Sequence, residues 1–377
     1  MLLVAAAVQT AAATDRFVPA DPHFVVADVR KAVPDTELRE LISRWRADPA
    51  SDAASVALGE AFLERAGKLR QPMYVGRAEA VLAPAAARAG ASTAALRLYA
   101  QTLQFRHDFP AAEYLLDKVL IAAPRDAAAR VQRASLRLVR GEFTGAGADC
   151  AQSLAAGGAE QAIALACLAQ VQAASGRLTQ AQALLASTLP PAQLPAVRAY
   201  WLTVRGELHE RAGALDHAIA DYGAALALAP ENDAIRASLA DALVARGGPH
   251  DASELLAVER PGLGLLVRRA ACARGAERET LRAQARALLE LESARGDAIH
   301  RREAALLALD AGDAARALAE AEANFKSQKE LVDVRILARA AVAARDVEAR
   351  RWLTEWLRNT GYRDAVTEAI LGTTVGG

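Results

Sequence analysis

The chain has 377 residues, of which 53% are hydrophobic and only 5% aromatic, and alanine and leucine supply most of the apolar fraction. Both residues are strong helix formers, while β-branched runs and alternating strand patterns are almost absent, so we expect an all-α protein. The 45 Lys and Arg balance the 45 Asp and Glu. Because sequence-independent binding of nucleic acid needs clustered positive charge, this balance argues against DNA or RNA as a partner.

The N-terminal residues 1–15 begin with an apolar stretch, Leu2 to Val8, followed by small residues. This stretch is similar to a secretory signal that lacks its charged start, and it predicts an exported or periplasmic protein; a cytoplasmic protein with an alanine-rich tail is the alternative. No later segment reaches the roughly 18 uncharged apolar residues of a membrane span, so we expect none. Residues 16–34 contain two prolines and no helical period, which predicts an extended N-terminal arm.

A repeating pattern begins after this arm. We expect a short helix from Glu37 to Arg46, with Asp35 or Thr36 as its N-cap. A glycine followed five residues later by an alanine then recurs, and the first four of these alanines are 35, 37 and 34 residues apart. The five pairs are Gly141/Ala146, Gly176/Ala181, Gly213/Ala218, Gly247/Ala252 and Gly312/Ala317. The wider interval before the last pair leaves room for one degenerate copy that turns at Gly275. A period near 34 predicts stacked two-helix units over residues 35–345.

Two units carry a fuller pattern of large, small and terminal residues. The unit 93–126 supplies Leu96, Tyr99, Ala100, Leu103, Ala112, Leu116 and Pro124, and the unit 199–232 supplies Leu202, Gly206, His209, Ala218, Tyr222 and Pro230. These residues resemble the tetratricopeptide repeat family, over roughly residues 50 to 345. The resemblance implies a right-handed α-solenoid, in which each hairpin covers the open apolar face of its neighbour and contacts join successive units.

The resemblance also implies a non-enzymatic scaffold that binds a protein or peptide. First helices line the concave side of such a solenoid, and their positions 2, 5, 9 and 12 point toward it. Here these positions predict a groove formed by Glu60, Arg97, Gln101, Gln104, Gln170, Tyr200, Thr203, Glu207 and Glu210. The unit at 127 contributes a mostly apolar lining, Ala128, Val131, Ser135 and Leu138. Such a groove suits a segment with an apolar ridge and some positive charge.

Two further interpretations concern assembly and location. A structural subunit that self-associates through the arm or through one end of the solenoid is the alternative function. The phrases QFRHDF, GDAIHRREA and ANFKSQKELVDVR are similar to those of uncharacterised exported bacterial tetratricopeptide proteins, which favours export.

The sequence contains no signature of an enzyme or a cofactor site. HExxH, P-loop and GxSxG patterns and a Gly-rich dinucleotide turn are all absent, so we expect no catalytic residues, no cofactor and no metal. His209 and His217 have acidic neighbours, but packing and surface positions explain them better than a metal site. The polar residues of NFKSQKELVD are expected to cap helix ends at a junction between hairpins.

The cysteines offer a candidate cross-link. Cys150 and Cys167 lie at similar distances on either side of the Gly157–Gly158 turn, so on antiparallel helices they stand at similar heights. We expect a disulfide between them in an exported protein; two reduced core thiols are the alternative. Cys272 has no evident partner.

Residues 346–377 are expected to cap the stack. A helix from Val347 to Leu357 carries Trp352 and Trp356 on one face, because they are four residues apart. A last helix is expected from Asp364 to Leu371, followed by a frayed tail.

Overall fold

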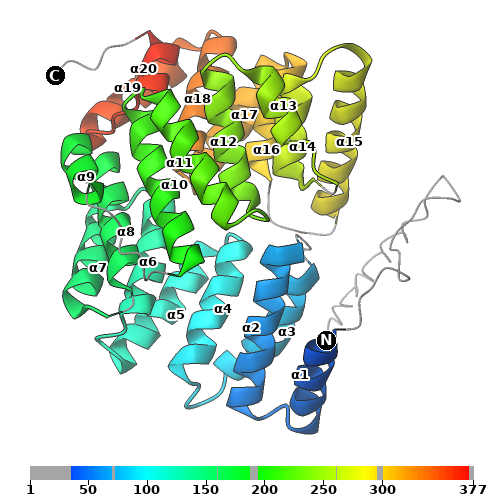
Figure 1. Cartoon of the computed structure of the whole chain (residues 1–377), viewed down its shortest axis with the longest axis vertical. Coiled ribbons are helices and arrows are strands. Elements are labelled where there is room, and N and C mark those ends of the chain that lie inside the picture. The colour runs from blue at the N-terminus through cyan, green and yellow to red at the C-terminus, as the bar shows by residue number, and fades with distance from the viewer. Residues whose placement is uncertain are drawn as a thin grey trace, which may run out of the picture.

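The computed structural model describes residues 35–69, 73–158, 160–186, 194–259, 261–294 and 300–372. Throughout these ranges the regular structure is α-helical, with no strand, and the helices follow one another as antiparallel hairpins (Figure 1). The expected all-α solenoid is therefore confirmed. The signal-like residues 1–15 and the arm 16–34 lie outside the described residues, so the predictions made for them stay predictions.

The hairpins use nearly the same plan along the chain. A short helix, α1 (Thr36–Ala47), comes first, and a short one, α20 (Ala365–Leu371), comes last. Between them the described residues form the pairs α2 (Asp52–Leu69) with α3 (Met73–Ala86), α4 (Thr93–Phe105) with α5 (Phe109–Ala122), α6 (Ala127–Arg140) with α7 (Phe143–Ala156), α8 (Gln161–Ala174) with α9 (Leu178–Leu185), α10 (Pro195–Arg211) with α11 (Leu215–Leu228), α12 (Asp233–Ala245) with α13 (Pro249–Leu255), α14 (Leu263–Cys272) with α15 (Gly275–Ala294), α16 (Arg301–Ala311) with α17 (Ala314–Phe325), and α18 (Leu331–Ala343) with α19 (Val347–Thr360).

Local sequence accounts for where many of these helices begin and end. Asp35 caps α1, because its side chain accepts a hydrogen bond of 2.9 Å from the backbone N–H of Leu38. Gly141 and Gly312 end α6 and α16 in the left-handed conformation, with φ of 78° and 79°, which glycine adopts without a steric penalty. The repeating glycines of the sequence are thus turn residues between the two helices of a hairpin.

Small residues let the two helices of a hairpin approach closely. Gly206 of α10 faces the ring of Tyr222 on α11, and a Cβ placed on this glycine would lie 2.8 Å from Tyr222 Cε1. Ala218 is fully buried in the same seam. Tyr222 in turn fills the space toward the next unit, where it packs with Leu239 and Leu243 of α12.

A polar contact repeats with the same register in two units. Arg205 of α10 donates two hydrogen bonds, of 2.8 and 2.5 Å, to the Asp221 carboxylate on α11. Arg133 of α6 donates two, of 2.8 and 2.6 Å, to Asp149 on α7. The arginine and the aspartate are 16 residues apart in both units. Because the same spacing produces the same geometry, the repeat seen in the sequence is also a repeat in space.

The C-terminal units fold back onto the middle of the solenoid. Helix α20 lies against α10 as well as α18 (Figure 1). The backbone N–H of Lys329, between α17 and α18, donates a 2.6 Å hydrogen bond to the carbonyl of Val139 in α6. The turn at Gly361 touches the turn at Gly176, where an added Cβ would meet the Gly361 carbonyl. The expectation that contacts join only successive units is therefore wrong at this place.

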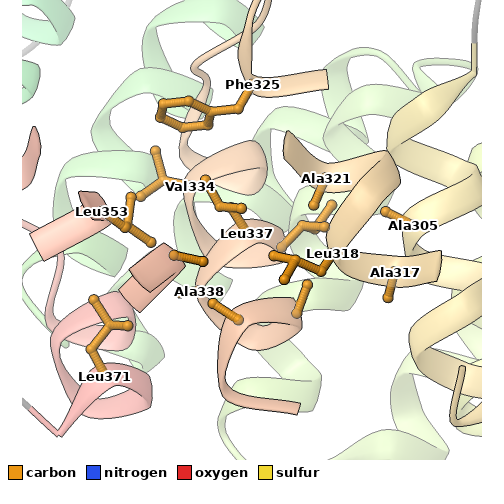
Figure 2. Close-up of a cluster of buried hydrophobic side chains, with 14 of the residues drawn as sticks. Ala305, Ala317, Leu318, Ala321, Phe325, Val334, Leu337, Ala338, Leu353 and Leu371 are labelled. Atoms are coloured by element: carbon orange, nitrogen blue, oxygen red, sulfur yellow. The ribbon is translucent and has the colours of Figure 1, made fainter. Parts of the chain in front are cut away.

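An apolar core supports this long-range contact. Figure 2 shows Phe325, Leu337, Leu353 and Leu371, from α17 to α20, gathered in one buried cluster, which also includes Ala174 of α8. The ring of Trp356 packs edge-on against Phe143 of α7, with ring centroids 6.5 Å apart. The last hairpins are thus held by hydrophobic burial as well as by hydrogen bonds.

Candidate functional site

The N-terminal part of the predicted groove stays accessible. Glu60 of α2 is exposed, and Arg97, Gln101 and Gln104 of α4 are half-buried. Arg97 Nη1 lies 3.7 Å from Asp126 Oδ1. Within the described part of the chain the side-chain amides of Gln101 and Gln104 make no hydrogen bond. Each amide therefore keeps a donor and an acceptor for another molecule or for water.

The middle of the predicted groove is a hydrogen-bonded row across two neighbouring first helices. The Tyr200 hydroxyl donates to Gln170 Oε1 at 2.9 Å, and Gln170 Nε2 donates to Glu207 Oε2 at 3.1 Å. The structure therefore brings Gln170, Tyr200 and Glu207 together on one face of α8 and α10. Thr203 does not join this row, because its hydroxyl donates to the carbonyl of Ala199 in its own helix. Burial raises the pKa of Tyr200 well above its ordinary value, so this hydroxyl stays protonated at neutral pH.

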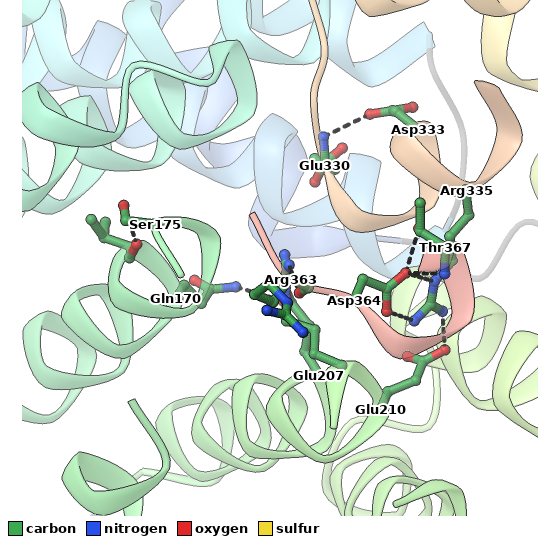
Figure 3. Close-up of polar contacts among 12 residues, drawn as sticks. Gln170, Ser175, Glu207, Glu210, Glu330, Asp333, Arg335, Arg363, Asp364 and Thr367 are labelled. Carbon is green, nitrogen blue, oxygen red and sulfur yellow. Dashed lines mark hydrogen bonds and ion pairs between the residues drawn. The ribbon is translucent and has the colours of Figure 1, made fainter. Parts of the chain in front are cut away.

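Glu210 is not available to a ligand, which corrects the prediction made for it. Its side chain is only 3% exposed, because α20 packs against α10 and Arg335 of α18 reaches over this end of the helix. Glu210 Oε2 accepts a 2.8 Å hydrogen bond from the Tyr222 hydroxyl, and Glu210 Oε1 pairs with the guanidinium of Arg335 (Figure 3). Arg335 also donates to both carboxylate oxygens of Asp364, at 2.9 and 2.7 Å. A position that faces the groove in the repeat pattern is here filled by the chain's own C-terminal units.

Opposing effects set the charge of these two carboxylates. Burial raises the pKa of Glu210, and the Arg335 charge acts against that rise without cancelling it. Burial also acts to raise the pKa of Asp364, but hydrogen bonds from Arg335 and Thr367 and the charge of Arg335 bring it below its ordinary value. Arg335 is therefore the group that keeps Asp364 ionised inside the protein.

A second buried arginine of this contact was not predicted from the sequence. Arg211, at the end of α10, has a side chain only 4% exposed. Its guanidinium donates two hydrogen bonds to Glu207 Oε1, of 3.0 and 2.9 Å, and its Cζ lies 4.4 Å from the centroid of the Tyr362 ring. The four-residue step from Glu207 to Arg211 predicts an ion pair on one helix face. Nothing in that step predicts burial beneath Tyr362, which lies far along the chain.

Cys150 and Cys167 are joined in the structure. Their sulfurs are 2.06 Å apart and their Cα atoms 5.9 Å apart, so α7 is linked to α8 across the boundary between two hairpins. Cys272 carries a free thiol whose pKa burial raises to about 11. That thiol therefore stays protonated and reacts slowly at neutral pH.

The histidines form no metal centre in the described part of the chain. The rings of His209 and His217 have centroids 5.3 Å apart, and His209 Nε2 lies 3.6 Å from Asp221 Oδ2. Across the described residues, no group of three or more His, Cys, Asp or Glu side chains is arranged to hold a metal ion. His300 Nδ1 lies 3.7 Å from Glu303 Oε2.

The junction residues before α18 do cap a helix, as expected, and they also reach across the molecule. Glu330 and Asp333 form a capping box at the start of α18, in which the Glu330 backbone N–H donates to Asp333 Oδ2 at 3.0 Å. Asn324 donates to Asp333 Oδ1 at 2.8 Å. Gln328 Nε2 lies 3.3 Å from His107 Nδ1 in the turn between α4 and α5.

Among the described helices we find no candidate membrane span, because none combines the length and the hydrophobicity that a span requires.

Comparisons with known proteins find only solved structures that are distantly similar in shape. No family model matches the sequence, and no curated protein matches it. Solved structures of tetratricopeptide proteins are similar in shape. One is a thermophilic tetratricopeptide protein of Thermus thermophilus, with 20% identity, a TM-score of 0.42, and coverage of 52% of this chain and 100% of the other. Another, from Parabacteroides merdae, has 14% identity, a TM-score of 0.40, and coverage of 80% and 98%.

A third similar structure is the human IFIT1 dimer with PPP-AAAA, with 14% identity, a TM-score of 0.48, and coverage of 86% of this chain and 77% of the other. Likeness at this level does not extend to what those proteins bind. The tetratricopeptide-like architecture rests on the chain's own hairpins, glycine turns and repeated arginine–aspartate register. The chain is a helical-repeat protein consistent with the tetratricopeptide fold.

Proposed function

We propose that this chain is a non-enzymatic scaffold that binds a segment of a partner protein along the first helices α2, α4, α6 and α8. The observation that carries the proposal is the contrast between two stretches of one predicted groove. The Glu210 carboxylate is bound to other side chains of the chain itself. Gln101 and Gln104 on α4, by contrast, keep their hydrogen-bonding groups unpaired within the described residues and remain accessible to solvent. The accessible stretch is therefore the part of the groove where a ligand docks.

The chemistry of this stretch favours a polypeptide. A side-chain amide pairs with a peptide bond through one donor and one acceptor, so Gln101 and Gln104 suit an extended backbone. Val131 of α6 is half-buried and offers apolar contact, and exposed Glu60 favours a positive charge on the ligand. No cluster of positive charge lies among these residues to prefer a phosphate backbone.

A peptide selection tests this proposal. A random peptide library is selected against the full chain, and the enriched peptide is titrated into it by isothermal calorimetry. Replacing Gln101 and Gln104 by alanine removes two hydrogen-bonding amides, so binding should weaken about tenfold. Gln180→Ala with Gln284→Ala is the matched control, because it removes two exposed glutamines from the second helices α9 and α15. An equal loss of peptide affinity in both double variants would contradict binding in the groove.

Self-association is the second candidate, and one observation favours it. Tyr114 and Ile121 lie on α5 with exposed fractions of 59% and 81%, and a spacing of two helical turns places them on one face. Large apolar side chains exposed together often mark a contact surface. Light scattering after size-exclusion chromatography tests this candidate, with Ile121→Asp as the variant that converts an oligomer into a monomer.

We further infer that the protein works after export, in an oxidising compartment. The pairing of Cys150 with Cys167 supports this inference, because structural disulfides persist outside the reducing cytosol. Thiol alkylation of the protein directly in its native cell fraction tests it. A reduced Cys150–Cys167 pair in that fraction would favour the cytoplasmic alternative.

A further inference from the structure

The last full helix carries a cationic hollow on its outer face. A cavity of about 350 Å³ lies between α19 and the end of α20, and Leu371 contributes to its lining. The other lining residues all belong to α19, and they are Val347, Arg350, Arg351, Thr354, Glu355 and Arg358. Three arginines against one glutamate give this lining a formal charge of +2 in a chain whose total is zero.

Two of these arginines have no partner in the described part of the chain. Arg351 and Arg358 are exposed and form neither a hydrogen bond nor an ion pair there. Arg350 donates one long hydrogen bond, of 3.4 Å, to the carbonyl of Leu371. Arg335, by contrast, is bound to two buried carboxylates. The outer face of α19 therefore keeps positive charge that the protein itself does not neutralise.

The short final helix explains why this face is open. The earlier first helices have between 10 and 18 residues, as in α14 and α2, whereas α20 has 7. Helix α20 therefore covers α18 and only part of α19. Val347, at the start of α19, is 74% exposed, which adds an uncovered apolar edge to the cationic stripe.

We propose that this hollow binds an acidic helical segment of a partner protein, laid along α19. Arg351 and Arg358 are seven residues apart, which is two turns, or about 10.5 Å along the helix axis. A partner helix with two carboxylates two turns apart presents them at the same interval. An apolar side chain one turn outside this pair of carboxylates, next to the one that faces Arg351, contacts Val347 and Leu371, because Val347 lies four residues before Arg351 and the Leu371 carbonyl accepts from Arg350.

A helical peptide fits this hollow better than a bare phosphate group does. The backbone N–H groups along the middle of α19 are bound within the helix, so none points into the cavity as it would in a phosphate-binding loop. The Thr354 hydroxyl donates to the carbonyl of Arg350 at 2.8 Å, so it offers no donor to the cavity. The lining combines separated cations with apolar edges, which is the complement of an acidic amphipathic helix.

This surface is separate from the concave face, and its preferred charge is opposite. The groove near Glu60 favours a positive ligand, whereas the hollow at α19 favours a negative one. The two binding sites can therefore be tested separately. A double variant at Gln101 and Gln104 should leave binding of an acidic helix at Arg351 and Arg358 unchanged.

A designed peptide tests the proposal. The probe is a fluorescein-labelled alanine-based helix with two glutamates two turns apart and a leucine one turn outside them, and the matched peptide has glutamine in place of both glutamates. In fluorescence anisotropy at low salt the acidic probe should bind the full chain, and binding should weaken as salt screens the charges. Arg351→Glu with Arg358→Glu should weaken it about tenfold or more. A probe with lysine in place of glutamate should bind this double variant better than it binds the parent.

Controls separate a site from general electrostatics. Arg125→Glu with Arg316→Glu alters two exposed arginines elsewhere and changes the net charge equally, so it should leave binding intact. The milder pair Arg351→Gln and Arg358→Gln gives the same readout if charge reversal disturbs folding, which circular dichroism monitors. The proposal is overturned if the acidic probe binds no better than its glutamine counterpart. It is equally overturned if both charge-reversed proteins lose binding alike, or if inorganic phosphate displaces the probe more effectively than chloride at matched ionic strength.

Discussion

Replacing Arg335 by alanine should strongly destabilise the contact between the C-terminal units and α10. The guanidinium binds two carboxylates whose side chains are 3% and 0% exposed, those of Glu210 and Asp364. Removing one partner of a buried ion pair costs about 3–5 kcal/mol, because the other charge is left uncompensated. Although Arg335 binds two carboxylates, we expect the total loss of unfolding free energy to stay in that range and not to double. Glu210 keeps its hydrogen bond from Tyr222, and Asp364 keeps the one from the Thr367 hydroxyl.

Urea unfolding followed by tryptophan fluorescence measures this loss. Arg339→Ala is the matched control, since Arg339 lies one turn further along α18, is exposed and has no ion pair in the described part of the chain. The control should change the unfolding free energy by less than about 0.5 kcal/mol. Hydrogen exchange should rise in α20 and at the end of α10 in the Arg335→Ala protein, because these segments lose their shared partner.

Two outcomes would refute this reasoning. One is an Arg335→Ala protein within about 1 kcal/mol of the parent, which would mean that the pair contributes no more than a surface ion pair. The other is unchanged hydrogen exchange in α20, which would mean that α20 does not depend on α10. Adding Glu210→Gln to Arg335→Ala should recover part of the loss, because a neutral amide replaces one uncompensated charge.

Other described contacts support three further predictions. Burial alone would raise the pKa of Glu303, but a hydrogen bond from His300 and nearby arginines lower it from 4.5 to about 2. Its stabilising effect of about 3 kcal/mol is therefore present above pH 4.5 and lost as the pH falls toward 2; Glu303→Gln should flatten that part of a urea-stability profile against pH. Breaking the 17-residue loop between Cys150 and Cys167 with reductant should cost about 3 kcal/mol. Three alkylatable thiols in unreduced, denatured protein would contradict the bond. Gly206→Ala should lower the unfolding free energy by about 1–3 kcal/mol through its clash with the Tyr222 ring, and an unchanged thermal midpoint would contradict that packing.

The repeat and its local features were predictable because they depend on nearby residues. The glycine–alanine period places the turns, and Asp35 caps α1 as its residue type suggests. The match in height between Cys150 and Cys167 follows from their distances to one turn. Each of these features needs only the geometry of one hairpin, or of two in succession.

The contact of the C-terminal units with α10 was not predictable from the repeat pattern. Small rotations between units accumulate along the stack, and no single unit encodes where the chain meets itself. Glu210 looks like other groove positions in the sequence, and its partner Arg335 is 125 residues away. Two residues at such separation give no periodic signal in one sequence. Arg211 was missed for the same reason, since its cover is Tyr362.

The packing of α20 against α10 changes how the protein unfolds from its C-terminal end. In an open row of hairpins the terminal unit has one neighbour, so it frays first and the next unit follows. Here the last helix has a second attachment in the middle of the chain, and peeling from that end must break both seams at once. A molecule tethered in this way should resist unravelling from its C-terminal side under mechanical load, and should yield there in one large step instead of several small ones.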